Sequence, residues 1–186
     1  GLLIGLCGPA RSGKDTAANA AVEQLGFDRY SFAEPVKRAA QQMFGLTDEE
    51  TWSDEKKEQV NEFWGITHRE MFQKIGTEGG RDIFDPDLWI RRATKELWNR
   101  YGENDDYNLV VPDVRFDNEA DWIHSKNGIV IRINRPDVEP IATSGHASET
   151  SLSPVNIDYH VANDVDIDTF VQRFLWSIHE IRMVRE

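Results

Sequence analysis

Residues 2–7 read Leu-Leu-Ile-Gly-Leu-Cys and run directly into Gly8-Pro-Ala-Arg-Ser-Gly-Lys-Asp-Thr16. The first part is a nearly continuous apolar run, which is typical of a central parallel strand covered on both faces. The second part is a glycine-rich turn followed by a helical pattern, and the order strand, glycine turn and helix is the context of a phosphate-binding P-loop. This stretch predicts an α/β protein with a central, mainly parallel sheet flanked by helices.

The residue types in this turn suit a nucleoside triphosphate. Gly8 and Gly13 let the backbone expose successive N–H groups toward phosphate oxygens, at a helix start whose dipole favours anions. Lys14 adds a point charge near the β- and γ-phosphates. The alternative is a glycine-rich turn that arose by chance and binds no phosphate. The motif alone also does not separate a kinase from a GTPase, an ATPase motor or a regulatory nucleotide-binding protein. We expect contacts to ATP from Gly8, Arg11, Ser12, Gly13, Lys14, Asp15 and Thr16.

One residue of the turn departs from the usual pattern. Asp15 stands where a serine or threonine normally contacts Mg²⁺, and Thr16 follows one place late. Either Asp15 approaches the metal, directly or through water, or the Thr16 hydroxyl takes that place. Both residues are therefore candidate metal contacts.

Hydrophobic periodicity extends the α/β pattern along the chain. Residues 46–66 are acidic and aromatic, and we expect them to be irregular or to form short helices. Strands are expected at 2–7, 28–32, 108–111, 128–133 and 159–162, and helices at 16–25, 35–44, 67–76, 86–101, 116–126 and 168–185.

Composition limits the classes of partner. The chain has 33 acidic and 21 basic residues and a net charge of −12, without the basic stripe expected of a protein that binds a nucleic-acid polymer. No stretch approaches the ~20 apolar residues of a membrane span. The apolar start runs into Gly8 and Arg11 without a basic leader, so we expect a strand there and not a signal peptide. Cys7 is the only cysteine, which suits a reducing cytoplasm.

A second polar group follows the predicted strand 108–111. Asp113 and Arg115 fall just past its carboxyl end, where ligands of open α/β sheets bind. A carboxylate there suits Mg²⁺ waters or a sugar hydroxyl, and an arginine grips a phosphate bidentately. Glu119, one helical turn further on, either pairs with Arg115 or touches the ligand. The alternative is a helix-capping Asp113 with a surface ion pair.

A third group surrounds the helix predicted from residue 67. Arg69 and Gln73 share one helical face, and the helix is expected to break at Gly76-Thr77, where exposed amides and a hydroxyl would meet an acceptor. A solvated polar face is an equally good reading of this spacing. Trp89 either walls a nucleobase or belongs to the core.

The 186 residues fit one domain with a small inserted lid. Residues 135–157 are rich in Pro, Ser and Thr and too long for an ordinary connection, so we expect a functional loop there. Arg132 and Arg135 precede it, as suits a lid that covers ATP and neutralises transferred charge, although Arg132 also fits the solvent side of a strand. His146 within the loop is a weaker candidate.

Together these segments resemble the phage-type deoxynucleoside monophosphate kinase family. The chain is shorter than that family between about 45 and 66, and Arg69-Glu70 stands where two adjacent basic residues are frequent, so the second cation is either His68 or absent. The matching pieces follow one order over nearly the whole chain: Gly8–Thr16, Ala33-Glu-Pro-Val-Lys37, Gln73-Lys-Ile-Gly-Thr77, Trp89, Pro112-Asp-Val-Arg115 through Glu119, Arg135-Pro136 and His146-Ala-Ser-Glu149.

The resemblance implies a kinase with a core, an acceptor-binding region at about 36–100 and a lid at about 135–157. It implies ATP with Mg²⁺, a deoxynucleoside monophosphate as acceptor, often a homodimer, and the cytoplasm of an infected bacterium. Lys14, Arg69, Asp113 and Arg115 would be catalytic. The acceptor site would be lined by Arg69, Gln73, Gly76, Thr77, Trp89, Asp113, Arg115 and Glu119.

Two other classes of protein stay open at this point. One is another small-molecule P-loop kinase, such as a phosphomevalonate or dephospho-coenzyme A kinase. The other is a nucleotide-binding regulatory protein that hydrolyses ATP slowly and has no phosphate acceptor.

Overall fold

The computed structural model describes residues 1–136 and 152–185, and the chain divides into two compact units. The first unit is Gly1–Ser31 with Trp98–Glu186, and the second is Phe32–Leu97. The second unit nearly coincides with the acceptor-binding region predicted at 36–100. His146 and most of the predicted lid lie outside the described residues.

The first unit is built on a parallel sheet. Its described residues form five strands in the order β2-β3-β1-β4-β5, with β1 at the centre between β3 and β4. All registered pairs are parallel, as the buried apolar run at β1 predicts. The strands are β1 (Leu2–Cys7), β2 (Asp28–Arg29), β3 (Asn108–Val111), β4 (Ile129–Asn134) and β5 (Tyr159–Ala162).

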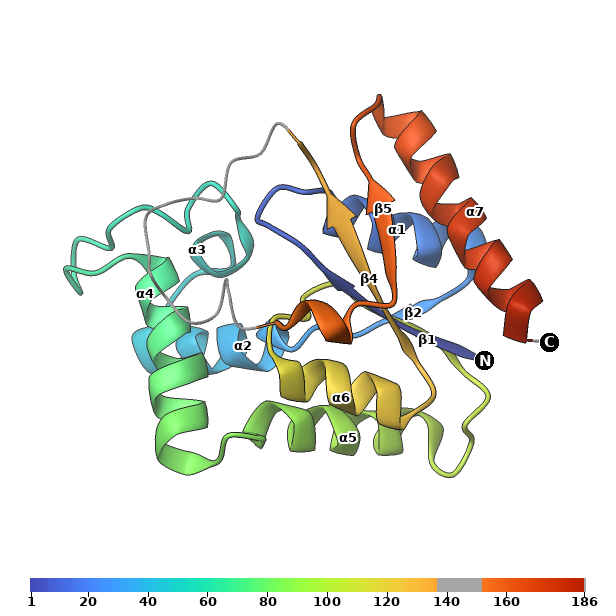
Figure 1. Ribbon diagram of the computed structural model, residues 1–186. Coiled ribbons are helices and arrows are strands. Elements are labelled where there is room, and N and C mark those ends of the chain that lie inside the picture. The colour runs from blue at the N-terminus through green and yellow to red at the C-terminus, as the bar shows by residue number, and fades with distance from the viewer. Residues whose placement is uncertain (137–151, 186) are drawn as a thin grey trace. The chain divides into compact units, whose positions relative to one another are not determined.

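Helices cover both faces of this sheet (Figure 1). The helices α1 (Lys14–Leu25) and α7 (Ile167–Arg185) pack together over one face, and their alanines and phenylalanines form one core with alternate residues of β1 and β4. Helix α6 (Asp117–Ser125) packs on β1 and β4. A side chain at Gly5 would come within 2.4 Å of Ile123 of α6, so the helix lies close to the strand. The sheet is therefore buried between α1 and α7 on one face and α6 on the other.

The second unit is helical. Its small core gathers Ala40, Leu46 and Met71. The last turn of α5, from Trp98, belongs to the first unit. The helices are α2 (Ala33–Phe44), α3 (Asp48–Trp52), α4 (His68–Gln73), the π-helix η1 (Lys74–Phe84) and α5 (Leu88–Tyr101).

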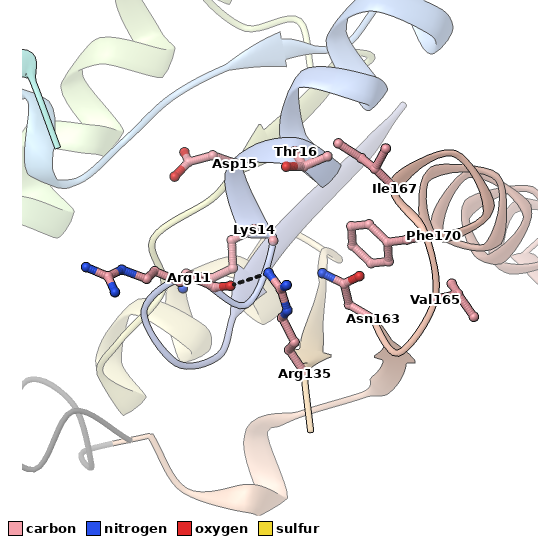
Figure 2. Close-up of a pocket in the computed structure, with 10 residues that line it drawn as sticks. Arg11, Lys14, Asp15, Thr16, Arg135, Asn163, Val165, Ile167 and Phe170 are labelled. Carbon is pink, nitrogen blue, oxygen red and sulfur yellow. Dashed lines mark hydrogen bonds between the residues drawn. The ribbon is translucent and has the colours of Figure 1, made fainter. Parts of the chain in front are cut away.

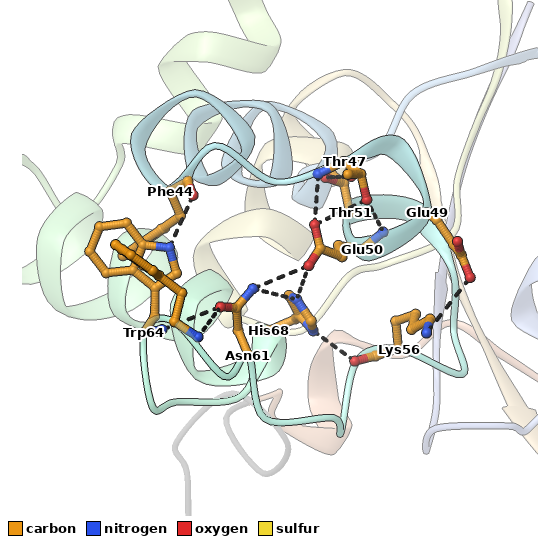
Figure 3. A network of polar contacts seen from close by, with 10 residues as sticks. Phe44, Thr47, Glu49, Glu50, Thr51, Lys56, Asn61, Trp64 and His68 are labelled. Carbon is orange, nitrogen blue, oxygen red and sulfur yellow. Dashed lines mark hydrogen bonds and ion pairs between the residues drawn. The ribbon is translucent and has the colours of Figure 1, made fainter.

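A polar network fastens the segment before α4 (Figure 3). His68 is buried, and its ring lies 2.9 Å from the Lys56 carbonyl oxygen through Nδ1 and 3.6 Å from Glu50 through Nε2. Asn61 donates to Glu50 at 3.2 Å. Because the His68 ring is enclosed by backbone and side-chain partners, it anchors the loop before α4.

Two predicted elements were wrong in extent. The helix expected to break at Gly76 continues as η1 to Phe84, so the amides of 76–81 belong to a helix and are not a free turn. Trp89 stabilises this continuation, because its indole donates to the Gly76 carbonyl at 2.7 Å and lies against Gly80. The strand expected at 28–32 ends at Arg29, since the chain turns there into α2.

Other predicted elements agree with the structure within one or two residues, which is the usual uncertainty of helix and strand ends. A capping box begins α4: Thr67 Oγ1 accepts from Glu70 N at 3.1 Å, and Glu70 Oε2 accepts from Thr67 N at 2.9 Å. Across residues 1–136 and 152–185, a helix both long enough and apolar enough to span a membrane is not found.

Candidate active site

The turn predicted to bind phosphate joins β1 to α1 and is held tightly against its surroundings. Gly8 and Gly13 have φ angles of 137° and 105°, which side chains rarely adopt. A Cβ at Gly8 would lie 2.5 Å from the Ile133 carbonyl, and one at Gly13 would lie 2.6 Å from Asn163 Nδ2. Both glycines are therefore required by backbone conformation and by space.

Lys14 lies over this turn. Its Nζ donates to the carbonyl oxygens of Gly8 at 2.9 Å and Pro9 at 2.6 Å. The pKa of Lys14 is lowered to about 8, chiefly by burial and then by the nearby positive charge of Arg115, against the opposing charges of Asp15, Cys7 and Asp113. The ammonium is thus held where an added anion would relieve its cost of burial.

A cavity of about 380 Å³ opens beside the turn (Figure 2). Three cationic side chains reach it, and Arg135 also donates to the Arg11 carbonyl at 3.4 Å. The opposite part of its lining is apolar. This division suits a nucleoside triphosphate, with cations for phosphates and an apolar surface for a base. The lining residues are Arg11, Gly13, Lys14, Asp15, Thr16, Arg135, Asn163, Val165, Ile167 and Phe170.

Four residues of this lining escaped the sequence reasoning: Asn163, Val165, Ile167 and Phe170. Asn163 donates from Nδ2 to the Ser12 carbonyl at 2.8 Å, which ties the turn to the segment after β5. Val165 and Ile167 are exposed to 39% and 63%, although both are apolar. A signal was present, because these residues follow the carboxyl end of β5, as Asp113 follows β3.

The side chain of Ser12 also indicates that the turn binds phosphate. Its side chain is fully buried, and its Oγ has no hydrogen-bond partner among the residues that the structure describes. An unpaired buried hydroxyl costs roughly 1–3 kcal/mol, so such an atom needs an explanation. A phosphate oxygen bound by the turn is a suitable partner.

The second predicted group, after β3, lies in the same unit. Asp113 is half-buried, and its Oδ2 accepts from Ser31 Oγ at 2.7 Å, so Asp113 is not the helix cap considered above. Glu119 is buried, and its Oε2 accepts from the backbone N–H groups of Arg115 at 2.7 Å and Phe116 at 3.1 Å. Glu119 thus fixes the backbone of Arg115, whose guanidinium is exposed and whose charge acts on Lys14.

The third group lies in the second unit. Arg69 Nε donates to Glu58 Oε1 at 2.5 Å, and Gln73, Gly76 and Thr77 are half-buried along α4 and η1. Trp89 is half-buried and packs on η1, as described above. Arg69 and Gln73 share a helix as expected.

The two arginines before the predicted lid differ in placement. Arg135 lines the cavity. Arg132 pairs with Cys7 in the β1–β4 register, and its Nε donates to Asn134 Oδ1 at 3.1 Å, so it belongs to the sheet rather than to the cavity wall.

The donor set at the turn suits a metal that arrives with its nucleotide. Asp15 and Thr16 line the cavity, while the described residues contain no converging group of three His, Cys, Asp or Glu side chains. Mg²⁺ is commonly held by one or two protein oxygens together with substrate phosphates and water. One carboxylate and one hydroxyl meet that requirement.

The Lys14 pKa leads to a prediction about proton uptake. A bound polyphosphate favours the charged amine, so we expect ATP binding at pH 8.5 to take up roughly three quarters of a proton, and little at pH 7. Affinity for ATP should accordingly fall as pH rises through 8. Calorimetry in buffers of different ionisation enthalpy measures the uptake. Lys14→Arg, always charged, is the control, and equal uptake by both proteins would contradict the assignment.

Comparison with known proteins agrees with this geometry. Residues 52–174 match the sequence profile of the family described as deoxynucleotide monophosphate kinase. A protein of Acanthamoeba polyphaga mimivirus, provisionally assigned as a deoxynucleotide monophosphate kinase, is 38% identical over 184 residues, covering 94% of each chain. The deoxynucleoside-5'-monophosphate kinase of Escherichia phage T5 is 22% identical and covers 89% of this chain and 90% of its own.

Solved structures agree on the fold. A dephospho-CoA kinase from Campylobacter jejuni superposes with a TM-score of 0.54 at 16% identity, covering 99% of this chain and 98% of that one. A Thermus thermophilus protein, TT1252, gives a TM-score of 0.54 at 18% identity, covering 96% of each chain. The architecture is that of a P-loop kinase.

Proposed function

Since the chain belongs to the deoxynucleotide monophosphate kinase family, we propose that it transfers the γ-phosphoryl group of ATP to a deoxynucleoside 5'-monophosphate, giving ADP and a deoxynucleoside diphosphate. The observation that carries this proposal is the hydrogen bond from Val114 N to the Leu6 carbonyl oxygen, 3.0 Å long. This bond holds the motif after β3 against the end of β1, where the phosphate-binding turn begins. Lys14 on the turn and Arg115 in the motif thus suit two phosphorylated substrates bound side by side.

The proposed reaction is an in-line displacement. An oxygen of the acceptor phosphate forms a bond to the γ-phosphorus, and the bond from that phosphorus to the β,γ-bridging oxygen breaks, so that ADP leaves with the electron pair. The acceptor phosphate is already ionised near pH 7, so no general base is needed. The protein contributes position and charge neutralisation.

Each part of the site has a proposed task. Lys14, Arg11 and Arg135 neutralise the phosphates of ATP, while Val165, Ile167 and Phe170 face its base, supported by the cavity between them. Arg115 grips the acceptor phosphate, Asp113 faces the acceptor sugar, and Glu119 holds Arg115 in place. We assign the remaining acceptor contacts to Arg69, Gln73, Gly76, Thr77 and Trp89, as the family resemblance implies.

Mg²⁺ bound with ATP supplies charge neutralisation on the β- and γ-phosphates. We assign its direct protein contact to Thr16, while Asp15 contacts it only through a bound water. Thr16 is the better placed for a direct contact, because Asp15 is engaged in an ion pair with Arg29 at 2.5 Å.

The partners proposed are small nucleotides. The related kinases come from a mimivirus and from Escherichia phages, which supports the cytoplasm of an infected host as the place of action. A homodimer stays a prediction of the family resemblance.

An ADP-release assay with each deoxynucleoside and ribonucleoside monophosphate tests the function. We expect rapid ADP release only when a deoxynucleoside monophosphate is present. ADP release independent of any monophosphate would point instead to a nucleotide-binding regulatory protein. Release driven by dephospho-coenzyme A or phosphomevalonate would assign another small-molecule kinase.

The contact between Arg69 and Glu58 gives a further prediction. An acceptor phosphate that binds Arg69 competes with the Glu58 carboxylate for the guanidinium charge. Because an exposed ion pair is worth about 0.2–1 kcal/mol, Glu58→Gln should lower the KM for the monophosphate by roughly 1.4- to fivefold. Steady-state kinetics measure this effect.

Glu96→Gln is the matched control, since Glu96 pairs with Arg92 on α5 of the same unit. It removes the same charge and should leave KM unchanged. If the KM of Glu58→Gln stays at the wild-type value, Arg69 does not contact the acceptor.

A further inference from the structure

The phosphate-binding turn carries an acidic residue, Asp15, although the ligand proposed for it is a polyanion. Asp15 directly follows Lys14, and its side chain is 72% exposed. A carboxylate beside a triphosphate repels it, and this repulsion weakens binding unless a cation offsets it. In Figure 2 the side chains of Asp15 and Thr16 point to opposite sides of the start of α1, with Thr16 toward Ile167.

Arg29 is the cation that meets Asp15. Its NH2 group donates to Asp15 Oδ1 at 2.5 Å, and its NH1 group donates to Asn19 Oδ1 at 2.5 Å. Asp15 and Asn19 are one turn apart on α1, so the planar guanidinium spans both with its two branches. Each branch of the guanidinium thus has its own acceptor on that helix.

Arg29 itself belongs to the sheet and not to the turn. It is the last residue of β2 and pairs in register with Val110 of β3. Its carbonyl oxygen accepts from Arg100 NH1 at 3.0 Å, and the preceding residue, Asp28, accepts from the Tyr101 hydroxyl at 2.5 Å. The backbone that carries Arg29 is therefore fixed independently of the turn that it serves.

We propose that Arg29 is a positioning residue for ATP: it neutralises Asp15 and holds that carboxylate on α1, away from the polyphosphate. This inference rests on the proposed function, because it takes the turn at residues 8–16 as the ATP site. Arg29 acts through Asp15 and makes no contact with ATP. The effect of replacing Arg29 must then depend on the charge at position 15.

A double-mutant cycle measures this dependence. The four proteins are the wild type, Arg29→Gln, Asp15→Asn and the double variant. Their affinity for ATP is measured by calorimetry in the presence of EDTA, so that no metal contact of Asp15 contributes. We expect Arg29→Gln to weaken binding about tenfold at low salt, and less at high salt because ions screen the repulsion. The double variant should bind ATP within about twofold of the wild type.

The outcomes separate the possible causes. If the double variant binds as weakly as Arg29→Gln, then Arg29 acts on ATP directly or through the fold, and the proposal is overturned. It is also overturned if Arg29→Gln binds like the wild type. Failure of the wild type itself to bind ATP would reject the proposed function instead.

Two controls guard against a loss of structure. Arg92→Gln removes an arginine from another ion pair, 2.9 Å long, and should leave ATP affinity unchanged. Arg29→Lys keeps the charge and should recover most of the affinity, whereas a purely structural role of the two-branched guanidinium would leave it as weak as Arg29→Gln.

Discussion

Replacing Lys14 with alanine is expected to lower kcat by about a thousandfold or more, which corresponds to about 4 kcal/mol of lost transition-state stabilisation. Lys14 lies over the phosphate-binding turn, with its Nζ within 2.9 Å of two turn carbonyls. Charge develops on the transferring phosphoryl group at this place. ADP release with saturating ATP and monophosphate measures the loss.

The fold of Lys14→Ala should survive. The lowered pKa shows that holding the ammonium in this site costs the folded protein free energy, so its removal relieves that cost while two hydrogen bonds are lost. Thermal unfolding at pH 7 should therefore give a Tm within a few degrees of the wild type. Turnover close to that of the wild type in a folded Lys14→Ala protein would reject the assignment of the site.

Replacing Arg115 with alanine is expected to lower kcat/KM for the monophosphate by about a hundred- to a thousandfold, because a bidentate arginine–phosphate contact combines charge with orientation. Glu119 already fixes the Arg115 backbone, so the guanidinium is presented at little further cost. The KM for ATP should change much less. Arg115→Lys keeps the charge but loses the two-pronged geometry, and we expect an intermediate value.

Arg115→Ala should also change the titration of Lys14. The positive charge of Arg115 lowers the Lys14 pKa, so removal of Arg115 should raise that pKa above about 8. The pH at which ATP affinity falls should move upward with it. Unchanged kcat/KM together with an unchanged pH profile would place Arg115 outside the site.

Much of the fold could be predicted because local sequence signals agreed with tertiary structure. The apolar run at β1 and the short apolar runs at β3 and β5 are typical of strands in a parallel sheet. The helix after Thr67 was predicted too short, because Gly76 and Gly80 read as a break in sequence. What keeps them helical is Trp89, thirteen residues beyond Gly76, and such a contact is not visible in local patterns.

Some residues of the site could likewise be predicted from the sequence, and others could not. The phosphate-binding turn could be recognised from its glycines and Lys14, since backbone conformation dictates those residue types. Val165 and Ile167 were missed, because isolated apolar residues after a strand look like ordinary surface or core, and their position after β5 was the one signal for them. The contact of Glu119 with Arg115 is local and was one of the two readings of their spacing, and it runs to the backbone N–H of Arg115. The pairing of Arg29 with Asp15 was not visible in the sequence, because it joins β2 to α1.

The central claim is that the turn carrying Lys14 and the motif carrying Arg115 form one continuous site. A bisubstrate compound, adenosine joined to a deoxynucleoside through five phosphates, tests it most directly by competition binding. The account predicts that the compound displaces both ATP and the monophosphate, and binds at least about a hundredfold more tightly than either. A compound that displaces ATP alone, with an affinity no better than that of ATP, would contradict it.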